Sequence, residues 1–528
     1  MSLARTMARP VAPGYAPYAW SASVDAVAAR HGIARETVLK FDQNTPPLPG
    51  VPQVPLAMSF AGLNEYPDGS YAELREAAAA YVGLTADHVV VGAGADDLIL
   101  LLAHVFVGPG SRAAIDPPTY ALYRIATTLH GGTLVGADDE CELAWICNPQ
   151  NPTGTWVEPE SIVERARSRP ETIVVVDEAY VEYGARSCVQ WVDELENLVV
   201  LRTMSKAFGF ASLRVGYAAA HPETAALLTE RRAPAPISGP AAAIAAAALR
   251  DPRLHEVEET IAERERVRSA LVDAGYSCEP SAGNFVALRT LEPLAERLEA
   301  QGMVVRDFAG GIRITMRRPS ENDVLLRALG AEPGPPAGRE ATVLRTTTET
   351  ALRLTLGLDG SGRSRVETGV GFLDHLLTLL AFHAGFDLEL VAAGDVDVDE
   401  HHTVEDVHAA LGSALSQALG AREGVARYGS AVVPMDEARA TAAVDLVRRP
   451  HAEISLAFAG DHVGSLAVSL LRHALERLAI EAGCTMHVEA RGADDHHVAE
   501  AAYKALGQAL RQAVAAGGEG IRSTKGVA

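Results

Sequence analysis

Short apolar runs alternate with stretches of helical periodicity through the first part of the chain. The runs predict strands, because buried parallel strands are apolar along their length, and they cover residues 88–92, 113–116, 143–147, 172–177 and 198–203. Helix-like patterns lie between them, as at residues 71–82 and 96–107. Strands that alternate with helices predict an α/β fold with a parallel-rich central sheet covered on both faces. An active site is then expected at the carboxyl ends of the strands.

A second pattern, an internal repeat, begins after residue 340. His375 and His473 occupy matching positions in two apolar helix-like runs, and each precedes a His-His pair, by 26 and 23 residues. The runs after the two pairs also correspond, Ala-Ala-Leu-Gly-Ser-Ala-Leu in one and Lys-Ala-Leu-Gly-Gln-Ala-Leu in the other. We therefore predict one strand–helix unit used twice, over about residues 341–430 and 431–528.

Residues 331–340, Ala-Glu-Pro-Gly-Pro-Pro-Ala-Gly-Arg-Glu, separate the two patterns. Three prolines and two glycines within ten residues prevent a regular element, and a helix-like stretch at 321–329 ends just before them. A long surface loop within one domain is the alternative interpretation. Because the motifs on the two sides differ completely, we predict one domain at residues 1–332, a linker at 333–340 and a second domain at 341–528.

The charge of the chain narrows the kinds of partner that it can have. Its 528 residues carry a formal net charge of −22, which argues against nucleic acid or an anionic membrane as the main partner. Small anionic substrates stay possible, because they need only a local cluster of arginine and lysine. Five cysteines without framework spacing are typical of reduced thiols in a cytosolic protein, and they are Cys141, Cys147, Cys188, Cys278 and Cys484.

Neither a signal peptide nor a membrane span is predicted. The N-terminus, Met-Ser-Leu-Ala-Arg-Thr, leads into no apolar core. The longest uncharged alanine-rich run, residues 233–249, is short for a span and contains Pro234, Pro236 and Pro240. We predict there a loop that enters a buried helix. A soluble cytoplasmic protein is expected.

The two His-His pairs belong to a duplicated His-His-x-x-Glu motif. Its residues are His401, His402 and Glu405 in one copy and His496, His497 and Glu500 in the other. On a helix, residues four apart share a face, so His401 and Glu405 can bind one metal while His402, about 100° away, serves another. Two metals, each also taking His375 or His473, account for all eight residues. Isolated histidines are usually ordinary surface or core residues, but so regular a set favours a metal centre, and its nitrogen and oxygen ligands favour manganese over structural zinc.

This metal set and the motifs around it closely resemble imidazoleglycerol-phosphate dehydratase over residues 341–528. The supporting motifs are Arg345-Thr-Thr-Thr-Glu349-Thr, Gly371-Phe-Leu-Asp-His375, Arg427-Tyr-Gly, Pro434-Met-Asp-Glu437 and Ser523-Thr-Lys525-Gly. The resemblance implies two similar α/β halves with helices on one face of the sheet, two Mn²⁺ per site, and assembly into a large symmetric shell. The implied reaction removes water from imidazoleglycerol phosphate and gives imidazole-acetol phosphate.

The same resemblance implies roles for residues of the second domain. Glu349 is implied to be an acid or base that faces the substrate, with Glu405, Glu500 and Lys504 close by. The residues implied to bind the substrate or to clamp its phosphate are His383, Arg427, Arg449, Ser523 and Lys525.

Lys206 is the candidate for covalent chemistry in the first domain. It is flanked by Thr203, Ser205 and Arg214, which fits a Schiff-base lysine beside a phosphate cradle, whereas an isolated lysine would simply be solvated. Two further motifs, Asn148-Pro-Gln-Asn151-Pro-Thr-Gly154 and Val174-Val-Val-Asp177-Glu-Ala-Tyr180, each follow or end a predicted strand. A third, Gly92-Ala-Gly-Ala-Asp96, precedes a helix, where backbone amides can hold phosphate.

Together these motifs match fold-type I pyridoxal-phosphate aminotransferases and most closely resemble histidinol-phosphate aminotransferase, over roughly residues 40–330. The resemblance implies that Lys206 forms the Schiff base and shuttles a proton, and that Asp177 keeps the pyridinium nitrogen protonated. It also implies that Tyr120 stacks on the cofactor ring and that Asn151 and Tyr180 hydrogen-bond its phenolic oxygen. The residues implied to surround the phosphate are Ala95, Asp96, Thr203, Ser205 and Arg214, with Tyr66 from the neighbouring subunit of a dimer.

Two arginines are implied to select the substrates. Arg313, in Gly-Ile-Arg-Ile-Thr, resembles the family's arginine for the carboxylate of glutamate, which a planar guanidinium suits. Arg306, in Val-Val-Arg-Asp, resembles the arginine that binds the substrate phosphate, and a surface salt bridge is its alternative role. The segment Asp42-Gln-Asn-Thr-Pro-Pro departs from the family's Asn-Glu-Asn-Pro.

The two implied reactions are consecutive, because the phosphorylated ketone made by the second domain is what the first domain would transaminate with glutamate. We therefore predict a bifunctional enzyme of histidine biosynthesis that ends at histidinol phosphate. One alternative is an aminotransferase that acts on another keto acid, such as an aromatic one. Another is that one region is a non-catalytic binding or assembly module.

Overall fold

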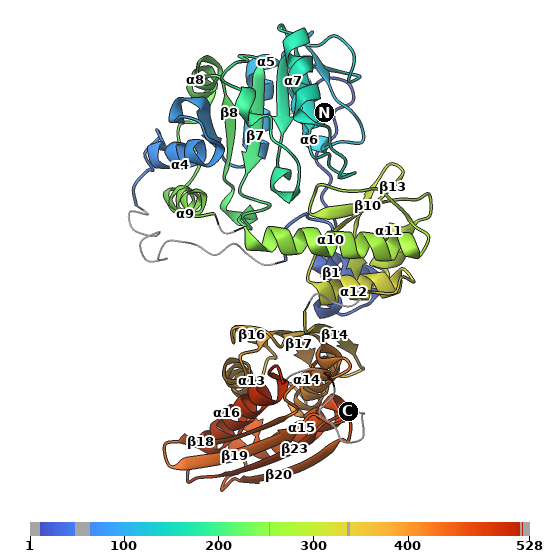
Figure 1. The fold of residues 1–528 in the computed structure, drawn as a ribbon, viewed down its shortest axis with the longest axis vertical. Helices are drawn as coiled ribbons and strands as arrows, with labels where there is room; N and C mark the ends of the chain where they lie inside the picture. The colour runs from blue at the N-terminus through green and yellow to red at the C-terminus, as the bar shows by residue number, and fades with distance from the viewer. Residues whose placement is uncertain (1–10, 48–63, 253, 335–337, 518–519, 521–528) are drawn as a thin grey trace. The chain divides into compact units, whose positions relative to one another are not determined.

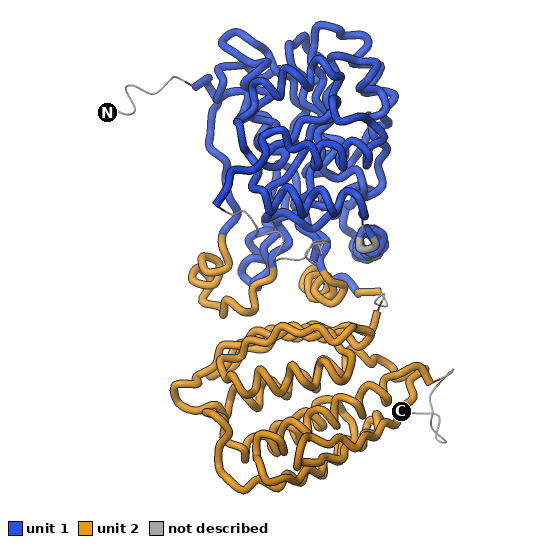
Figure 2. The backbone as a smooth tube through the Cα atoms, turned by 90° about the vertical axis from the view of Figure 1, so that its left-hand side faces the viewer, with its two compact units in different colours: residues 1–22, 40–317, 330–332 blue, residues 23–39, 318–329, 333–528 orange. Residues whose placement is uncertain are grey.

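The computed structural model describes residues 11–47, 64–252, 254–334, 338–517 and 520. The chain divides into two compact units, which Figure 2 colours separately. The first unit comprises residues 1–22, 40–317 and 330–332, and the second comprises 23–39, 318–329 and 333–528.

The division differs from the predicted one at two segments, 23–39 and 318–329, which the sequence placed in the first domain. Contacts of Ser320 show why the later segment groups with the second unit. Its hydroxyl lies 2.7 Å from that of Thr342, which lies 2.8 Å from that of Thr355. The limits of the two domains and of the linker stay a prediction.

A seven-stranded sheet forms the centre of the first unit (Figure 1). In spatial order its strands are β2 (Val89–Gly92), β8 (Gly216–Ala220), β7 (Leu198–Thr203), β6 (Ile173–Asp177), β5 (Leu143–Cys147), β3 (Arg112–Ala114) and β4 (Thr133–Val135). The strands from β7 to β4 run parallel, and β8 is antiparallel to both of its neighbours. All five predicted strands are present, which confirms the parallel-rich α/β sheet.

Helices cover both faces of this sheet, because side chains alternate between the faces along each strand. The helices around the sheet are α4 (Ala72–Val82), α5 (Ala95–Phe106), α6 (Ala121–Leu129), α7 (Pro159–Ser168), α8 (Pro222–Arg231) and α9 (Gly239–Arg250). Val175 and Leu201 pack with α5, α6 and α8 on one face, and Val174 and Val200 pack with α7 on the other. Half of the residues of α9 are buried, and the helix follows the proline-rich loop, as the sequence predicted.

The rest of the first unit contains a smaller sheet and two helices. The sheet has the order β12 (Arg306–Phe308), β13 (Gly311–Thr315), β10 (Phe285–Arg289) and β9 (Ser277–Cys278). The other elements are α10 (His255–Asp273), α11 (Leu294–Glu299) and the short strand β11 (Met303–Val304). The short strand β1 (Leu39–Lys40) contains the boundary between the two units.

The second unit contains two four-stranded sheets of identical topology. The first has the order β14 (Glu340–Thr346), β15 (Thr350–Gly357), β17 (Asp387–Gly394) and β16 (Ser364–Glu367). The second has the order β18 (Tyr428–Met435), β19 (Ala438–Asp445), β23 (Thr485–Arg491) and β20 (His451–Ala457). In each sheet the first three strands are antiparallel and the last pair is parallel, so the structure confirms the predicted repeat.

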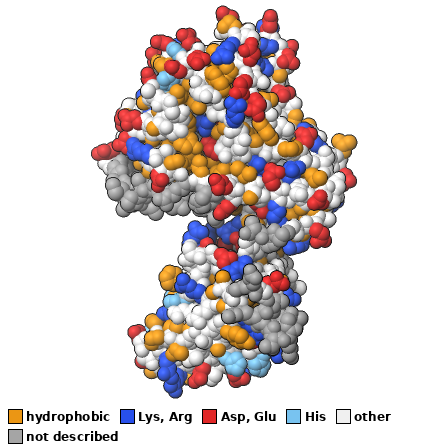
Figure 3. Space-filling model, in the orientation of Figure 1, with side chains coloured by type: hydrophobic (Ala, Val, Ile, Leu, Met, Phe, Trp, Pro, Cys, Tyr) orange, Lys and Arg blue, Asp and Glu red, His pale blue; other side chains and the backbone are white. Residues whose placement is uncertain are grey.

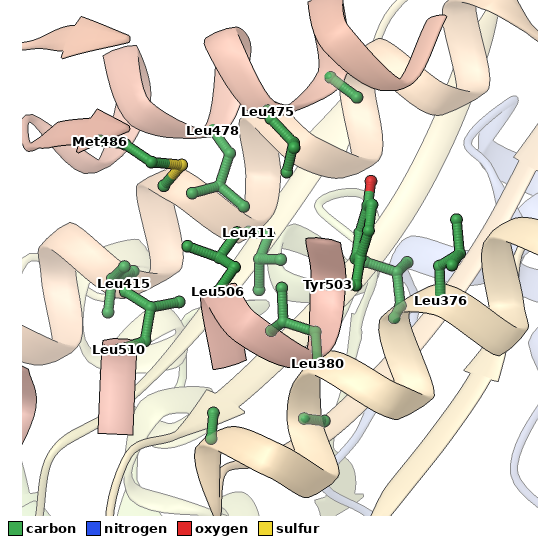
Figure 4. Packing of buried hydrophobic residues seen from close by; sticks show 14 of the residues in the cluster. Leu376, Leu380, Leu411, Leu415, Leu475, Leu478, Met486, Tyr503, Leu506 and Leu510 are labelled. Carbon is green, nitrogen blue, oxygen red and sulfur yellow. The ribbon is translucent and has the colours of Figure 1, made fainter. Parts of the chain in front are cut away.

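Four long helices lie between the two sheets, so each sheet carries helices on one face (Figure 1). They are α13 (Gly371–Ala384) and α14 (His401–Leu419) of the first repeat and α15 (Val468–Ala482) and α16 (Asp495–Val514) of the second. Figure 4 shows Leu380 of α13, Leu411 of α14, Leu478 of α15 and Leu506 of α16 converging in one apolar cluster. The two repeats therefore share a core, and neither can bury its helices alone. The unit also includes α2 (Val24–His31), α12 (Pro319–Ala328), β21 (His462–Val463) and β22 (Leu466–Ala467).

Two glycines at equivalent places in α14 and α16 let each helix approach the first helix of the other repeat. A Cβ atom on Gly412 would lie 2.5 Å from the carbonyl oxygen of Leu478, and one on Gly507 would lie 2.7 Å from that of Leu380. Each obstacle is a backbone atom, so the contact cannot relax by a side-chain rotation. The helices thus pair across the repeats, α13 with α16 and α14 with α15.

We expect Gly507→Ala to destabilise the second unit by about 1–3 kcal/mol, because the clash outweighs the ~1 kcal/mol that alanine gains within a helix. All four tryptophans lie in the first unit. In a urea titration, a transition that appears in circular dichroism but not in tryptophan fluorescence therefore reports the unfolding of the second unit. Gly371→Ala is the matched control, because a Cβ there meets no atom within 4 Å. An unchanged midpoint for Gly507→Ala would show that the helices separate at little cost.

The surface and the cysteines agree with the composition. On the face in Figure 3, basic side chains are scattered among acidic ones and form no continuous basic band. The five cysteines are unpaired. No helix within the described residues has the length and apolar character needed to cross a lipid bilayer.

Candidate active sites

The carboxyl ends of β6 and β7 bring Asp177 and Lys206 to one region of the first unit. Lys206 is half-buried, with its Nζ 3.5 Å from the carbonyl oxygen of Gln43 and 5.6 Å from the ring centre of Tyr180. Burial and the nearby charge of Arg313 lower the pKa of Lys206 to about 8. A substantial share of this amine is therefore neutral near pH 7.5, as a nucleophile or a general base requires.

Asp177 is buried at the last position of β6. Its carboxylate accepts a hydrogen bond of 2.7 Å from the Tyr123 hydroxyl and one of 3.1 Å from the Ala179 amide. Burial raises the pKa of Asp177 to about 6. The sequence analysis missed Tyr123, although it follows Tyr120 by three residues and so lies on the same face of α6.

The start of α5 gathers three residues predicted for the phosphate end of the site. Asp96 accepts hydrogen bonds of 2.9 Å from both the Tyr120 hydroxyl and the Arg214 guanidinium. Gly94 precedes the helix with a φ of +82°, a backbone conformation that favours glycine, and a Cβ there would lie 2.7 Å from Arg214 Nη2. Ala95 begins the helix, whose free amides favour an anion.

The remaining predicted residues for the cofactor lie close to this region, with one exception. Thr203 donates a hydrogen bond of 3.0 Å to Ser205 at the end of β7. Tyr66 lies 96% exposed, and the structure shows it no contact with the other predicted residues of this chain. The role of Tyr66 at the cofactor phosphate of a neighbouring subunit stays a prediction.

Arg313 lies buried in β13 beside the predicted ring-binding residues. Its Nη1 donates to Asn151 Oδ1 at 2.6 Å, and its charge lies over the ring of Phe285. The Tyr180 hydroxyl accepts a hydrogen bond of 2.9 Å from Asn44. Asn44 lies in the segment that departs from the family pattern, and the sequence analysis gave it no role.

Arg306 is held by the N-terminal part of the first unit. Its guanidinium donates to Ser21 Oγ at 3.0 Å and to the Ala19 carbonyl at 3.1 Å, and it lies 6.0 Å from the ring centre of Tyr18. None of these partners is an acidic residue, so the alternative role of a surface salt bridge does not describe it.

In the second unit, His375, His496 and Glu500 form a first cluster of potential metal ligands, one from α13 and two from α16. Oε1 of Glu500 lies 2.7 Å from His375 Nε2 and 3.1 Å from His496 Nε2, and Oε2 accepts a hydrogen bond of 2.7 Å from Lys504. Burial alone would raise the pKa of Glu500, but the hydrogen bonds from His375 and Lys504 hold it at about 2. This carboxylate is therefore ionised throughout the neutral range.

His401, Glu405 and His473 form an equivalent second cluster, two from α14 and one from α15. Oε2 of Glu405 lies 3.5 Å from His401 Nε2 and 3.2 Å from His473 Nε2. Its neighbouring cation is Arg477, whose Nε lies 3.5 Å from Oε1. Sequence reasoning missed Arg477, since it has no counterpart at the matching position of the first repeat.

His402 and His497 point away from both clusters. Nδ1 of His402 lies 3.0 Å from Asp395, and Nδ1 of His497 lies 2.9 Å from Glu437. The structure thus brings six of the eight predicted ligands together within one chain, three in each cluster. The hydrogen bonds to Asp395 and Glu437 raise the pKa of His402 and of His497 above its ordinary value.

The predicted substrate-binding residues of the second unit are more dispersed. Glu349 is exposed in the turn before β15, and His383 lines a cavity of about 590 Å³ with Arg511. Arg427 makes a bidentate pair with Asp445 at 2.7 and 2.9 Å. Arg449 is exposed, and Ser523 and Lys525 lie outside the described residues.

A buried polar pair joins the two helices that carry the paired histidines. His408 Nε2 lies 2.8 Å from the Tyr503 hydroxyl, and Nδ1 lies 2.8 Å from the Val404 carbonyl. Burial lowers the pKa of His408 to about 4. The two side chains hold equivalent positions, each three residues after a cluster glutamate, so the hydrogen bond spans the interface of the repeats.

Two protein-family models match the chain. The model for aminotransferase class I and II matches residues 36–329, and the model for imidazoleglycerol-phosphate dehydratase matches residues 368–510. Imidazoleglycerol-phosphate dehydratase of Methanococcoides burtonii is 46% identical over 189 residues, which are 36% of this chain and 99% of that protein. That of Phytophthora nicotianae is 50% identical over 191 residues, 36% of this chain but only 42% of that protein.

A solved structure resembles the first unit. It is histidinol-phosphate aminotransferase from Sinorhizobium meliloti in complex with pyridoxal-5'-phosphate, which is 28% identical and has a TM-score of 0.54. The alignment covers 59% of this chain and 94% of that one.

Proposed function

We propose a function from one premise: the chain belongs to the aminotransferase class I and II family through residues 36–329 and to the imidazoleglycerol-phosphate dehydratase family through residues 368–510. It is a bifunctional enzyme of histidine biosynthesis, a lyase and a transferase. Its second unit dehydrates imidazoleglycerol phosphate to imidazole-acetol phosphate. Its first unit then transfers an amino group from glutamate to that ketone and forms histidinol phosphate.

The observation that carries this proposal is the presence of two separate sets of reactive and ligating side chains on one chain. One is the buried Asp177 beside the amine of Lys206, and the other is the pair of His-His-Glu clusters. Each set suits one of the two reactions, and the product of one reaction is the substrate of the other.

The residues around Lys206 fit pyridoxal phosphate, which supplies an electron sink when it is bound. An ionised Asp177 would hold a proton on the pyridine nitrogen. The amine of Lys206 would bond to the cofactor and then move a proton at the substrate Cα. The helix start at Ala95 and Asp96, with Thr203, Ser205 and Arg214, would hold the phosphate. Tyr120 would stack on the ring, and Asn151 and Tyr180 would bind its oxygen.

The two clusters fit divalent cations, because each offers two imidazole nitrogens and a carboxylate oxygen within 4.8 Å of one another. We propose Mn²⁺, two per site, which would stabilise negative charge on the imidazole ring of the substrate. Glu349 and Lys504 would move protons, and His383 would contact the ring. Arg427, Arg449, Ser523 and Lys525 would bind the phosphate.

Several wider features belong to the same proposal. Arg313 would bind the carboxylate of glutamate, and Arg306 the phosphate of the ketone. The exposure of Tyr66 supports a dimer of the first unit, in which it would reach the partner's cofactor. The positions of His402 and His497 outside the clusters support a higher-order assembly of the second unit. A cytoplasmic location agrees with five unpaired cysteines.

The proposal is tested by supplying the purified chain with imidazoleglycerol phosphate, Mn²⁺, pyridoxal phosphate and glutamate. We expect histidinol phosphate as the product, and imidazole-acetol phosphate alone when glutamate is omitted. In a direct transamination assay the phosphorylated ketone should exceed phenylpyruvate in kcat/KM by roughly 100-fold or more, because Arg306 recognises the phosphate. Equal rates with the two ketones would favour an aminotransferase of aromatic keto acids instead.

A further inference from the structure

A buried charge network lies at the ends of the two strands that carry the predicted cofactor residues. Arg202 is 7% exposed and Glu178 is fully buried. The Arg202 guanidinium donates to Glu178 and to Glu182, both at 2.9 Å, and to Ser187 Oγ at 3.0 Å. Burial alone would lower the pKa of Arg202, but the charges of Glu178 and Glu182 leave it raised. The arginine is thus a fixed cation with all of its donor groups directed inward.

The network lies on the sheet face opposite to Asp177. Along β6 and β7, alternate side chains point to opposite faces. Asp177 lies on the same face as Val175, where its carboxylate contacts Tyr123. Glu178 and Arg202 lie on the other face, the face of Val176 and Val200, where they contact each other. The Glu178 amide also donates to the Leu201 carbonyl at 3.0 Å. Arg202, which lies within β7, and Glu178, the residue after β6, therefore continue the pairing of these strands one step past Asp177 and Leu201.

Glu178 also holds the loop that follows β6. Its Oε1 accepts a hydrogen bond of 2.6 Å from the Cys188 amide, and its Oε2 accepts one of 2.7 Å from the Ser187 hydroxyl. With Arg202 these contacts satisfy both oxygens, so no ligand is needed to explain the burial of this carboxylate. A buried ion pair is weak evidence for stability, because an apolar replacement is often as stable. The placement of the pair between two functional strand ends gives it another role.

We propose that Arg202 is a positioning residue that fixes the end of β6 relative to the end of β7, and so the place of Asp177 relative to Lys206. Asp177 lies directly before Glu178, and Thr203 directly follows Arg202. A shift between the strand ends would move the carboxylate away from the cofactor nitrogen while the lysine stayed bonded to the cofactor. This inference rests on the proposed cofactor, and its test reads cofactor binding as well as turnover.

The test compares Arg202→Lys with Arg266→Lys in the full chain. Lysine keeps the charge but has one nitrogen in place of the three with which Arg202 reaches Glu178, Glu182 and Ser187. Arg266 makes a bidentate pair with Glu263 on α10, at 2.8 and 2.7 Å, so it offers the same substitution in another paired site. We expect Arg202→Lys to weaken binding of pyridoxal phosphate by roughly 10-fold. The pH midpoint of the bound cofactor's absorbance should also move by about half a unit or more, because Asp177 influences the cofactor's charge. Arg266→Lys should change neither.

The outcomes separate this inference from the proposed function. If the wild-type chain binds no pyridoxal phosphate at Lys206, the proposed function itself fails. If the wild type binds it and Arg202→Lys matches Arg266→Lys in both readouts, the positioning role is overturned. Loss of stability alone, with unchanged affinity and midpoint in the folded fraction, also contradicts it. Glu178→Gln can keep an acceptor oxygen for the Cys188 amide but loses the one for Arg202 Nε, and it provides a second variant, for which we expect a shift in the same direction.

Discussion

Replacing Lys206 with alanine is expected to lower the rate of transamination by roughly 1,000-fold or more, because the variant loses both the nucleophile and the group that moves the proton. The geometry makes this a large effect. The pKa of about 8 leaves the amine partly neutral, and the described contacts of its Nζ are one carbonyl oxygen and a tyrosine ring. Dehydration should continue at the wild-type rate, since the two clusters lie in the other compact unit.

The measurement is the rate of transamination of imidazole-acetol phosphate with glutamate, beside the rate of dehydration in the same preparation. Lys206→Arg is the matched variant, because it keeps a positive charge but has no amine that can bond to the cofactor. Both variants should be equally inactive in transamination if the amine is what matters. A Lys206→Ala chain that kept a tenth of the wild-type rate would refute covalent participation of this lysine.

The strands of the central sheet were predicted well, because both faces of this sheet are buried and its strands are therefore mostly apolar along their length. β5 and β7 match their predicted limits, Leu143–Cys147 and Leu198–Thr203. β5 is apolar throughout, and β7 is apolar up to Leu201, where the polar residues begin. β3 ends at Ala114, two residues earlier than predicted, and Asp116 lies in the turn that contains Pro117 and Pro118. Because proline has no amide proton to donate to a neighbouring strand, β3 cannot continue in the sheet through these residues.

The pairing of helices across the repeats was not predictable from spacing. The spacing left open whether His375 or His473 joins a given His-His-x-x-Glu motif. The choice depends on close packing at Gly507 and Gly412, which sets α16 against α13 and α14 against α15. Such a contact between distant segments leaves no local pattern in the chain.

The functional residues missed by sequence reasoning are mostly buried polar groups. Tyr123 lies in an apolar helix, where a core aromatic residue is the ordinary interpretation. Arg202 and Glu178 stand beside the predicted motifs Thr203–Lys206 and Asp177, and their burial as an ion pair could not be predicted from one sequence. Only the structure shows that these side chains contact each other, because the contact depends on the register of β6 against β7.

Replacing His496 with alanine is expected to remove one metal ion per chain and to lower the rate of dehydration by roughly 1,000-fold or more, because it takes one of three donors from the first cluster. The variant would leave two donors in this cluster, His375 and Glu500, and Glu500 Oε2 is already hydrogen-bonded to Lys504. His401→Ala should have the same effect through the second cluster. Transamination should be unchanged in both variants.

Metal content after dialysis, measured together with the two rates, checks this expectation. His487→Ala is the control, because His487 is an exposed histidine of the same unit on β23, outside both clusters. It should keep two metal ions per chain and the wild-type rate. A chelator should reproduce the loss of dehydration in the wild type, and Mn²⁺ should restore it there but not in His496→Ala. The two clusters have equivalent ligands but different neighbouring cations, Lys504 beside one and Arg477 beside the other. We therefore expect each to bind its ion independently. Loss of both ions from His496→Ala would instead show that the two sites bind metal as a coupled pair.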